Sequence, residues 1–274
     1  MDSRIQEPDD TESWSADLHA VESTGAARAA GAQDDRAPEA PPTFTLEPLL
    51  QVLIHPDPWP QDDRLALLLD MADGSDEACY REGHSKRVAG LVRILVAEER
   101  LPENEVQALL LAARLHDIGK MGMPLAWIEA AAQDPEAIHK IREHAVRGAD
   151  FVTGLALPEA ALAAIRHHHE RWDGSGYPDG LSGADIPLGA RLIGLAEAID
   201  AVSAPAPPTR PWTVARLLAL AQHDAGRKWD PEIVARLMRL LLPALVAASR
   251  TANPRGLGVD SHRVHLSMDK SHLA

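Results

Sequence analysis

Three observations on the sequence predict an all-α fold, a bundle of about seven to nine helices. Aromatic residues make up only 4% of the 274 residues, so the core must consist mainly of Ala, Leu, Val and Ile, and the first two of these favour helices. Apolar residues recur every three or four positions through most of the chain, as they do on the buried face of a helix. No segment shows convincing strand character, and no internal repeat is visible.

The helical pattern can be followed from one segment to the next. The segment 84–100 has apolar residues at helical spacing, and 103–119 ends at Gly119, a residue type common at helix ends. Further along, Asp230 suits a helix N-cap and Pro231 suits the first helical position. The expected helices are 46–53, 63–72, 84–100, 103–119, 135–152, 158–170, 188–203, 211–225 and 230–245.

Composition divides the chain into a folded centre and two tails. Residues 1–44 are rich in Ala, Pro and acidic residues without apolar periodicity, which predicts a disordered acidic tail. Residues 45–80 are expected to form a short helical N-terminal cap, and residues 81–248 the main domain. The polar segment 249–274 is expected to be a flexible C-terminal tail.

Charge and cysteine content exclude several classes of function. The formal net charge of −14 argues against a polymeric nucleic acid as partner, since binding to phosphates requires an excess of Lys and Arg. The single cysteine, Cys79, excludes an intrachain disulfide and a cysteine-based zinc site. The start of the chain lacks a signal-peptide pattern and no apolar run reaches the roughly 20 residues of a membrane span, so we expect a cytoplasmic protein without membrane contact.

Side chains suited to metal ions occur at intervals of about 24 to 32 residues along consecutive predicted helices. Facing helices of a bundle can bring such residues to one internal point. Imidazole and carboxylate together suit Fe, Mn, Zn, Co or Ni. The residues in this series are His84, His116, Asp117, His144, His168, His169, Glu197 and Asp200.

Two motifs carry a resemblance to a known family. The segments HDIGKMGMP (116–124) and HHERWDGSGYPDGLSGADIPLGARL (168–192) resemble the HD-GYP family, which belongs to the HD superfamily of helical bundles. Its members are metal-dependent phosphodiesterases that hydrolyse the bacterial second messenger cyclic di-GMP. The likeness extends from about His84 to Pro231 and includes TRPW (209–212) and GRKWDP (226–231).

The resemblance implies a binuclear site and a set of functional residues. Two divalent ions, with Fe or Mn favoured and Zn, Co or Ni compatible, would be held by His84, His116, Asp117, His144, His168, His169 and Glu197. Asp117 and Lys120 would be catalytic, with Lys120 on the scissile phosphate, and Tyr177 and Arg210 would help to hold the substrate. Implied products are pGpG and GMP, and implied partners are cyclic di-GMP, a signalling protein at the GYP loop and a second copy of the chain.

The sequence departs from the family pattern at three functional positions. Glu197 stands where the family has the first Asp of ADxxDA, and its longer carboxylate is expected to reach the metal. Tyr80 stands where three-metal members have a Glu, which favours two ions. Thr213 replaces the second cation of the family's RPYR or RPYK motif. These departures leave two alternatives open: a weak or inactive HD-GYP signalling or binding protein, and an HD phosphohydrolase for another nucleotide.

Overall fold

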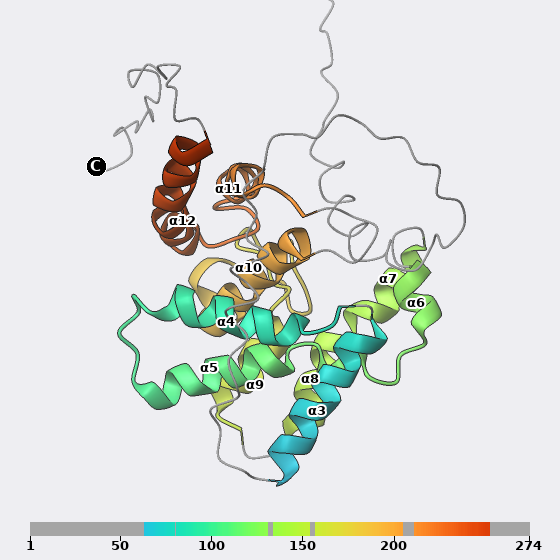
Figure 1. Ribbon diagram of the computed structural model, residues 1–274. Helices are drawn as coiled ribbons and strands as arrows, with labels where there is room; N and C mark the ends of the chain where they lie inside the picture. The colour runs from blue at the N-terminus through green and yellow to red at the C-terminus, as the bar shows by residue number, and fades with distance from the viewer. Residues whose placement is uncertain (1–62, 80, 131–133, 154–156, 205–210, 253–274) are drawn as a thin grey trace, which may run out of the picture.

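The computed structural model describes residues 63–79, 81–130, 134–153, 157–204 and 211–252 (Figure 1). The predicted tail 1–44, the predicted helix 46–53, and residues 253–274 lie outside the described residues. Tyr80 and Arg210 lie outside them as well. The expected domain limits therefore stay a prediction.

All regular elements in these described ranges are helices, which confirms the all-α prediction. Most of them begin and end within a few residues of the predicted bounds. The α-helices are α3 (Asp63–Ala78), α4 (His84–Val96), α5 (Glu103–Leu115), α6 (Leu125–Ala130), α7 (Pro135–Arg142), α8 (His144–Val152), α9 (Glu159–His167), α10 (Leu188–Ser203), α11 (Val214–His223) and α12 (Pro231–Ala252). Two short 3₁₀ helices, η2 (Ile118–Lys120) and η4 (Gly183–Asp185), connect them.

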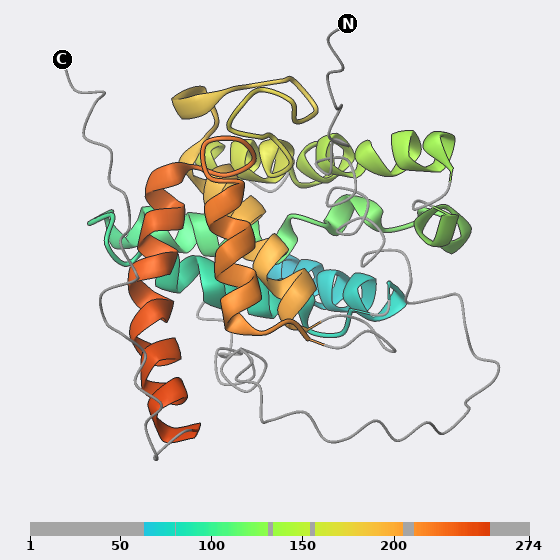
Figure 2. The same cartoon turned by 90° about the horizontal axis from the view of Figure 1, so that it is seen from above.

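The core lies between two pairs of helices that are far apart in the sequence, α4 with α5 and α9 with α10. Helix α4 packs against α5 and α10, and α9 lies against α5, α8 and α10. Their facing sides are aliphatic, as the composition predicts, with Leu110, Ile165, Leu192 and Ile199 almost completely removed from solvent. Burial of each such side chain stabilises the fold by about 1.5–3 kcal/mol relative to exposure. Helices α11 and α12 pack side by side at one flank of this core (Figures 1 and 2).

Some helix ends are shifted: α12 runs to Ala252 and so includes the first four residues of the predicted tail 249–274. Apart from such ends, the helix pattern differs from expectation in two places. The predicted helix 135–152 is divided at Glu143 into α7 and α8, because the His144 ring Nδ1 bonds the Ile141 carbonyl at 2.6 Å and occupies an acceptor of the last turn of α7. Helix α6 was not predicted from the sequence. The break at Glu143 lies beside the candidate ligand His144, where a local side-chain bond competes with helix continuity.

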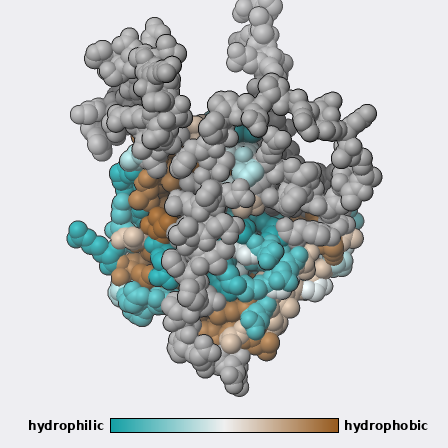
Figure 3. All heavy atoms as spheres, in the orientation of Figure 1, coloured by the Kyte–Doolittle hydropathy of each residue, from teal (hydrophilic) through white to brown (hydrophobic). Residues whose placement is uncertain are grey.

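The described surface is mixed in character. On the face seen in Figure 3, polar residues cover most of the described area and apolar residues form separate patches. Among the described helices, none is both long and apolar enough to cross a membrane.

Candidate metal centre

The seven predicted ligands meet inside the bundle in two groups. The candidate donor atoms of each group all lie within 4.8 Å of one another. All seven side chains are buried except His169, which is half-buried. One group is His84, His116, Asp117 and Glu197, and the other is His144, His168 and His169.

Asp117 lies between the two groups. Its Oδ2 is 3.7 Å from His84 Nε2 and 3.5 Å from His116 Nε2, while its Oδ1 is 3.3 Å from His144 Nε2. One carboxylate oxygen therefore faces each group. This is the arrangement that a carboxylate needs to bridge two cations.

The ring orientations of three histidines are fixed by their own helix ends. His116, His144 and His168 each bond through Nδ1 to the carbonyl oxygen three residues earlier, at 2.8, 2.6 and 2.7 Å. A metal-binding histidine is commonly oriented in this way by a bond from its second ring nitrogen. The bond directs Nε2 of each ring toward the centre of the site.

Several inward-facing atoms in the described region have no hydrogen-bond partner. They are Nε2 of His84, Nε2 of His116, Oδ1 of Asp117 and Oε1 of Glu197. Buried polar atoms are rarely left unsatisfied, because the lost hydration costs about 1–3 kcal/mol for each group. Imidazole nitrogens and carboxylate oxygens in this number and proximity fit divalent transition-metal ions. The residues present therefore match the cofactor that the motifs imply.

The protonation states also suit cation binding. Burial lowers the pKa of the His168 and His169 imidazoles well below its usual value, and neighbouring imidazoles lower it further. Burial opposes ionisation of Asp117, but Lys120 and the adjacent histidines hold the pKa of its carboxyl well below the usual range. Neutral imidazoles and an ionised carboxylate are the forms that bind metal ions.

Asp200 lies behind the ligand His84. Its fully buried carboxylate accepts bonds from His84 Nδ1 at 2.6 Å and from Arg87 Nε at 2.6 Å. Burial raises the pKa of Asp200, but these two partners outweigh burial and hold the pKa at about 2. Asp200 therefore orients a ligand, and Glu197, one turn earlier on α10, is the carboxylate that lies among the ligands. The sequence did not predict this role. The available signal was Arg87, which lies one turn after His84 and shares the same carboxylate partner.

Two glycines allow the ligand-bearing segments to approach each other. A Cβ on Gly119 would lie 2.0 Å from the His144 carbonyl oxygen. A Cβ on Gly194 would lie 2.7 Å from the His168 carbonyl oxygen. Both distances are far below van der Waals contact, so any larger residue would push a ligand-bearing helix end away from the centre.

The predicted catalytic and substrate residues lie around this centre. Lys120 Nζ is 2.8 Å from Asp117 Oδ2. The Tyr177 ring stacks on His169 with ring centroids 4.7 Å apart, and the Arg142 guanidinium lies 5.1 Å from the Tyr177 centroid. The structure thus brings Lys120 and Tyr177 to the site, while Arg210 falls outside the described residues.

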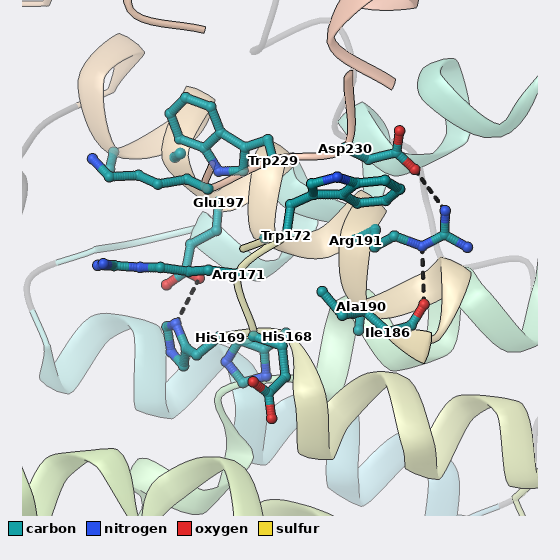
Figure 4. Close-up of a pocket in the computed structure, with 15 residues that line it drawn as sticks. His168, His169, Arg171, Trp172, Ile186, Ala190, Arg191, Glu197, Trp229 and Asp230 are labelled. Carbon is teal, nitrogen blue, oxygen red and sulfur yellow. Dashed lines mark hydrogen bonds and ion pairs between the residues drawn. The ribbon is translucent and has the colours of Figure 1, made fainter. Parts of the chain in front are cut away.

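A pocket of about 110 Å³ adjoins the centre (Figure 4). His168, His169 and Glu197 form its wall on the side of the ligands. The remaining wall includes Arg171, Trp172, Arg191, Lys228 and Trp229. A pocket of this size holds several times the ~10–15 Å³ that one water requires, so it can accept a small polar group of a ligand.

Comparison with known proteins relates the chain to one family. The HD domain family matches residues 66–233. The cyclic di-GMP phosphodiesterase response regulator RpfG of Xanthomonas campestris pv. campestris is 36% identical over 181 residues, which cover 64% of this chain and 46% of that protein. A cyclic di-GMP phosphodiesterase of Thermotoga maritima is 31% identical over 179 residues, covering 64% and 48%. The 3'3'-cGAMP-specific phosphodiesterase 2 of Vibrio cholerae is 29% identical over 191 residues, covering 64% and 37%. The chain thus matches less than half the length of each of these relatives.

Proposed function

Because this chain belongs to the HD-domain family and to its HD-GYP branch, we propose that it is a metal-dependent phosphodiesterase that hydrolyses cyclic di-GMP to pGpG and onward to GMP. The observation that carries the proposal is Asp117, whose two oxygens face two separate groups of donor atoms. Such a carboxylate suits a binuclear hydrolytic site. The choice of cyclic di-GMP as the substrate rests on the relatives that are named as cyclic di-GMP phosphodiesterases.

The proposed cofactor is a pair of divalent ions. The resemblance to the HD-GYP family favours Fe or Mn, and the same ligands are compatible with Zn, Co or Ni. When bound, the pair would polarise the phosphodiester and lower the pKa of an attacking water. We assign His84, His116, Asp117 and Glu197 to one ion and His144, His168 and His169 to the other, with Asp117 shared. Glu197 replaces an Asp of the family pattern, and its position among the donor atoms supports its assignment as a ligand.

The remaining residues act on the substrate. Lys120, held 2.8 Å from Asp117, stabilises the negative charge that develops on the phosphoryl oxygens. Tyr177 packs over His169 and holds the substrate beside the ligands, and Arg210 is assigned to substrate binding from the sequence. No nucleophilic side chain is required, because water is the nucleophile in this chemistry.

Three further expectations stay proposals. They are a cytoplasmic location, a signalling protein partner at the GYP loop, and a homodimer.

The proposal is tested by measuring metal content and cyclic di-GMP hydrolysis on the same anaerobically purified sample. We expect about two ions per chain and turnover with Fe(II) or Mn(II), and loss of both in His116→Ala. His223→Ala is the matched control, because His223 lies on α11 with a side chain 56% exposed and outside both ligand groups. Two ions without turnover would contradict the proposal and favour a cyclic di-GMP-binding signalling protein.

A substrate panel separates the remaining alternative. Since one relative is specific for 3'3'-cGAMP, both cyclic dinucleotides belong in the panel. Faster hydrolysis of 3'3'-cGAMP than of cyclic di-GMP would retain the reaction class and overturn the substrate assignment.

A further inference from the structure

We propose that Arg171 forms a second phosphate subsite, which holds the non-scissile phosphate of the cyclic dinucleotide next to the metal centre. The inference rests on the proposed function, since it concerns the same substrate. A cyclic dinucleotide carries two phosphodiester groups. When one phosphodiester lies at the metal ions and Lys120, the other phosphodiester of the same molecule lies nearby. It needs a cation of its own within the length of the cyclic dinucleotide.

Arg171 is placed beside the reacting centre by its position in the chain. It follows the ligand His169 by two residues, and both residues line the pocket that also contains Glu197 (Figure 4). Its side chain is half-buried. A molecule that enters this pocket therefore meets Arg171 together with the metal-binding residues His169 and Glu197.

The other cations of the pocket are already committed. Arg191 Nη1 is 2.6 Å from Asp230 Oδ2, and Arg191 Nε donates to the Ile186 carbonyl at 2.9 Å. Lys228 Nζ is 2.8 Å from Asp224 Oδ2. Within the part of the chain that the structure describes, the Arg171 side chain has neither a hydrogen bond nor an ion pair. It is the lining cation whose donors remain available to an anion.

The backbone around Arg171 is fixed before a ligand arrives. The adjoining residues bond to the loop before α12, with Trp172 N to the Lys228 carbonyl at 3.1 Å and Asp173 N to the Arg227 carbonyl at 2.8 Å. The Arg171 carbonyl itself accepts from Gly174 N at 2.8 Å. A preordered segment loses little conformational freedom on binding, so more of the interaction energy appears as affinity.

The chemistry of the group matches a phosphodiester. A guanidinium presents parallel N–H donors that bind two oxygens of a phosphate at once. A phosphodiester in a cyclic dinucleotide offers two non-bridging oxygens and one negative charge. Thr213 cannot supply the matching positive charge, because its side chain is neutral. Its hydroxyl caps α11 by accepting from Arg216 N at 3.3 Å.

The kinetic test compares Arg171→Gln with the matched control Arg227→Gln. Arg227 is an exposed arginine on the paired segment, and it is not among the residues that line the pocket. For cyclic di-GMP we expect Arg171→Gln to raise KM about ten- to a hundredfold, the loss typical of a hydrogen bond to a charged group. For bis(p-nitrophenyl) phosphate, which has one phosphodiester, we expect kcat/KM to change less than twofold. An equal loss on both substrates would overturn the proposal, because Arg171 would then act through the metal centre.

Equilibrium binding separates failure of this inference from failure of the proposed function. The probe is the bis-phosphorothioate analogue of cyclic di-GMP, which resists hydrolysis, titrated into the metal-loaded protein by calorimetry. We expect Kd to rise by a similar factor in Arg171→Gln and to stay unchanged in Arg227→Gln. This measurement does not require turnover, so it also tests the subsite in a protein that binds cyclic di-GMP without hydrolysing it. An unchanged Kd in Arg171→Gln would overturn the subsite and leave the phosphodiesterase proposal standing.

Discussion

The substitution Asp200→Asn is the most direct test of how the bundle orients its metal-binding residues. Asn at this position keeps the size of the side chain but removes the charge and one acceptor. Asp200 currently accepts from His84 Nδ1 and from Nε and Nη2 of Arg87, at 2.6, 2.6 and 3.2 Å. Asp200→Asn therefore releases the orientation of one metal ligand and leaves a buried guanidinium without its counter-charge.

Two separate losses are expected in Asp200→Asn. Removing a second partner from a metal-binding histidine typically weakens metal affinity about 10–100-fold. Breaking a buried ion pair on one side costs about 3–5 kcal/mol, and we expect the lower end because Asn retains one oxygen. For a folded region of this size, about 3 kcal/mol corresponds to a Tm lower by about 6–12 °C.

The two losses can be measured independently. Thermal unfolding in EDTA gives the stability of the metal-free protein, and calorimetric titration with Mn(II) gives the affinity. Asp73→Asn is the control, since Asp73 bonds Lys86 and the buried Arg114 at 2.6 and 3.0 Å without contacting a ligand. Asp73→Asn should lower Tm and leave Mn(II) affinity unchanged. If Asp200→Asn bound Mn(II) within twofold of the unsubstituted protein, the positioning role of Asp200 would be wrong.

Three further substitutions probe the geometry of the site and the core. Gly119→Ala should reduce metal content, because the new Cβ would lie 2.0 Å from the His144 carbonyl oxygen, whereas Gly74→Ala meets no atom within 4 Å and should keep both ions by elemental analysis. Tyr177→Phe keeps the ring that stacks on the metal ligand, so metal content should be unchanged and a rise in KM for cyclic di-GMP would report the hydroxyl alone; a loss of metal would contradict this division of roles. Leu195→Ala removes a side chain that is 1% exposed and should lower the free energy of unfolding by about 2–5 kcal/mol in urea titration, and a cost below about 1 kcal/mol would contradict its place in the core.

Local sequence information was sufficient for most of the helices, although not for α6. The segment 188–203 was predicted as a helix and has these bounds as α10, because propensity and apolar spacing act over a few residues. Asp230 was predicted as an N-cap, and its Oδ1 accepts from Glu232 N at 2.8 Å. The break at Glu143 was not predicted, since it depends on the ring of His144 competing for the Ile141 carbonyl.

The sequence by itself determined which side chains can bind metal ions, because a donor atom's chemistry belongs to its residue type. Only the tertiary structure decided their grouping. The division into two groups, the position of Asp117 between them and the bond from Asp200 to His84, 116 residues away, all depend on how helices pack. The same holds for Arg171: its side chain has no hydrogen bond or ion pair in the described region, whereas the neighbouring pocket cations Arg191 and Lys228 pair with Asp230 and Asp224. Periodicity specifies the face of a helix that is buried, and side-chain packing between distant segments specifies which atoms meet there.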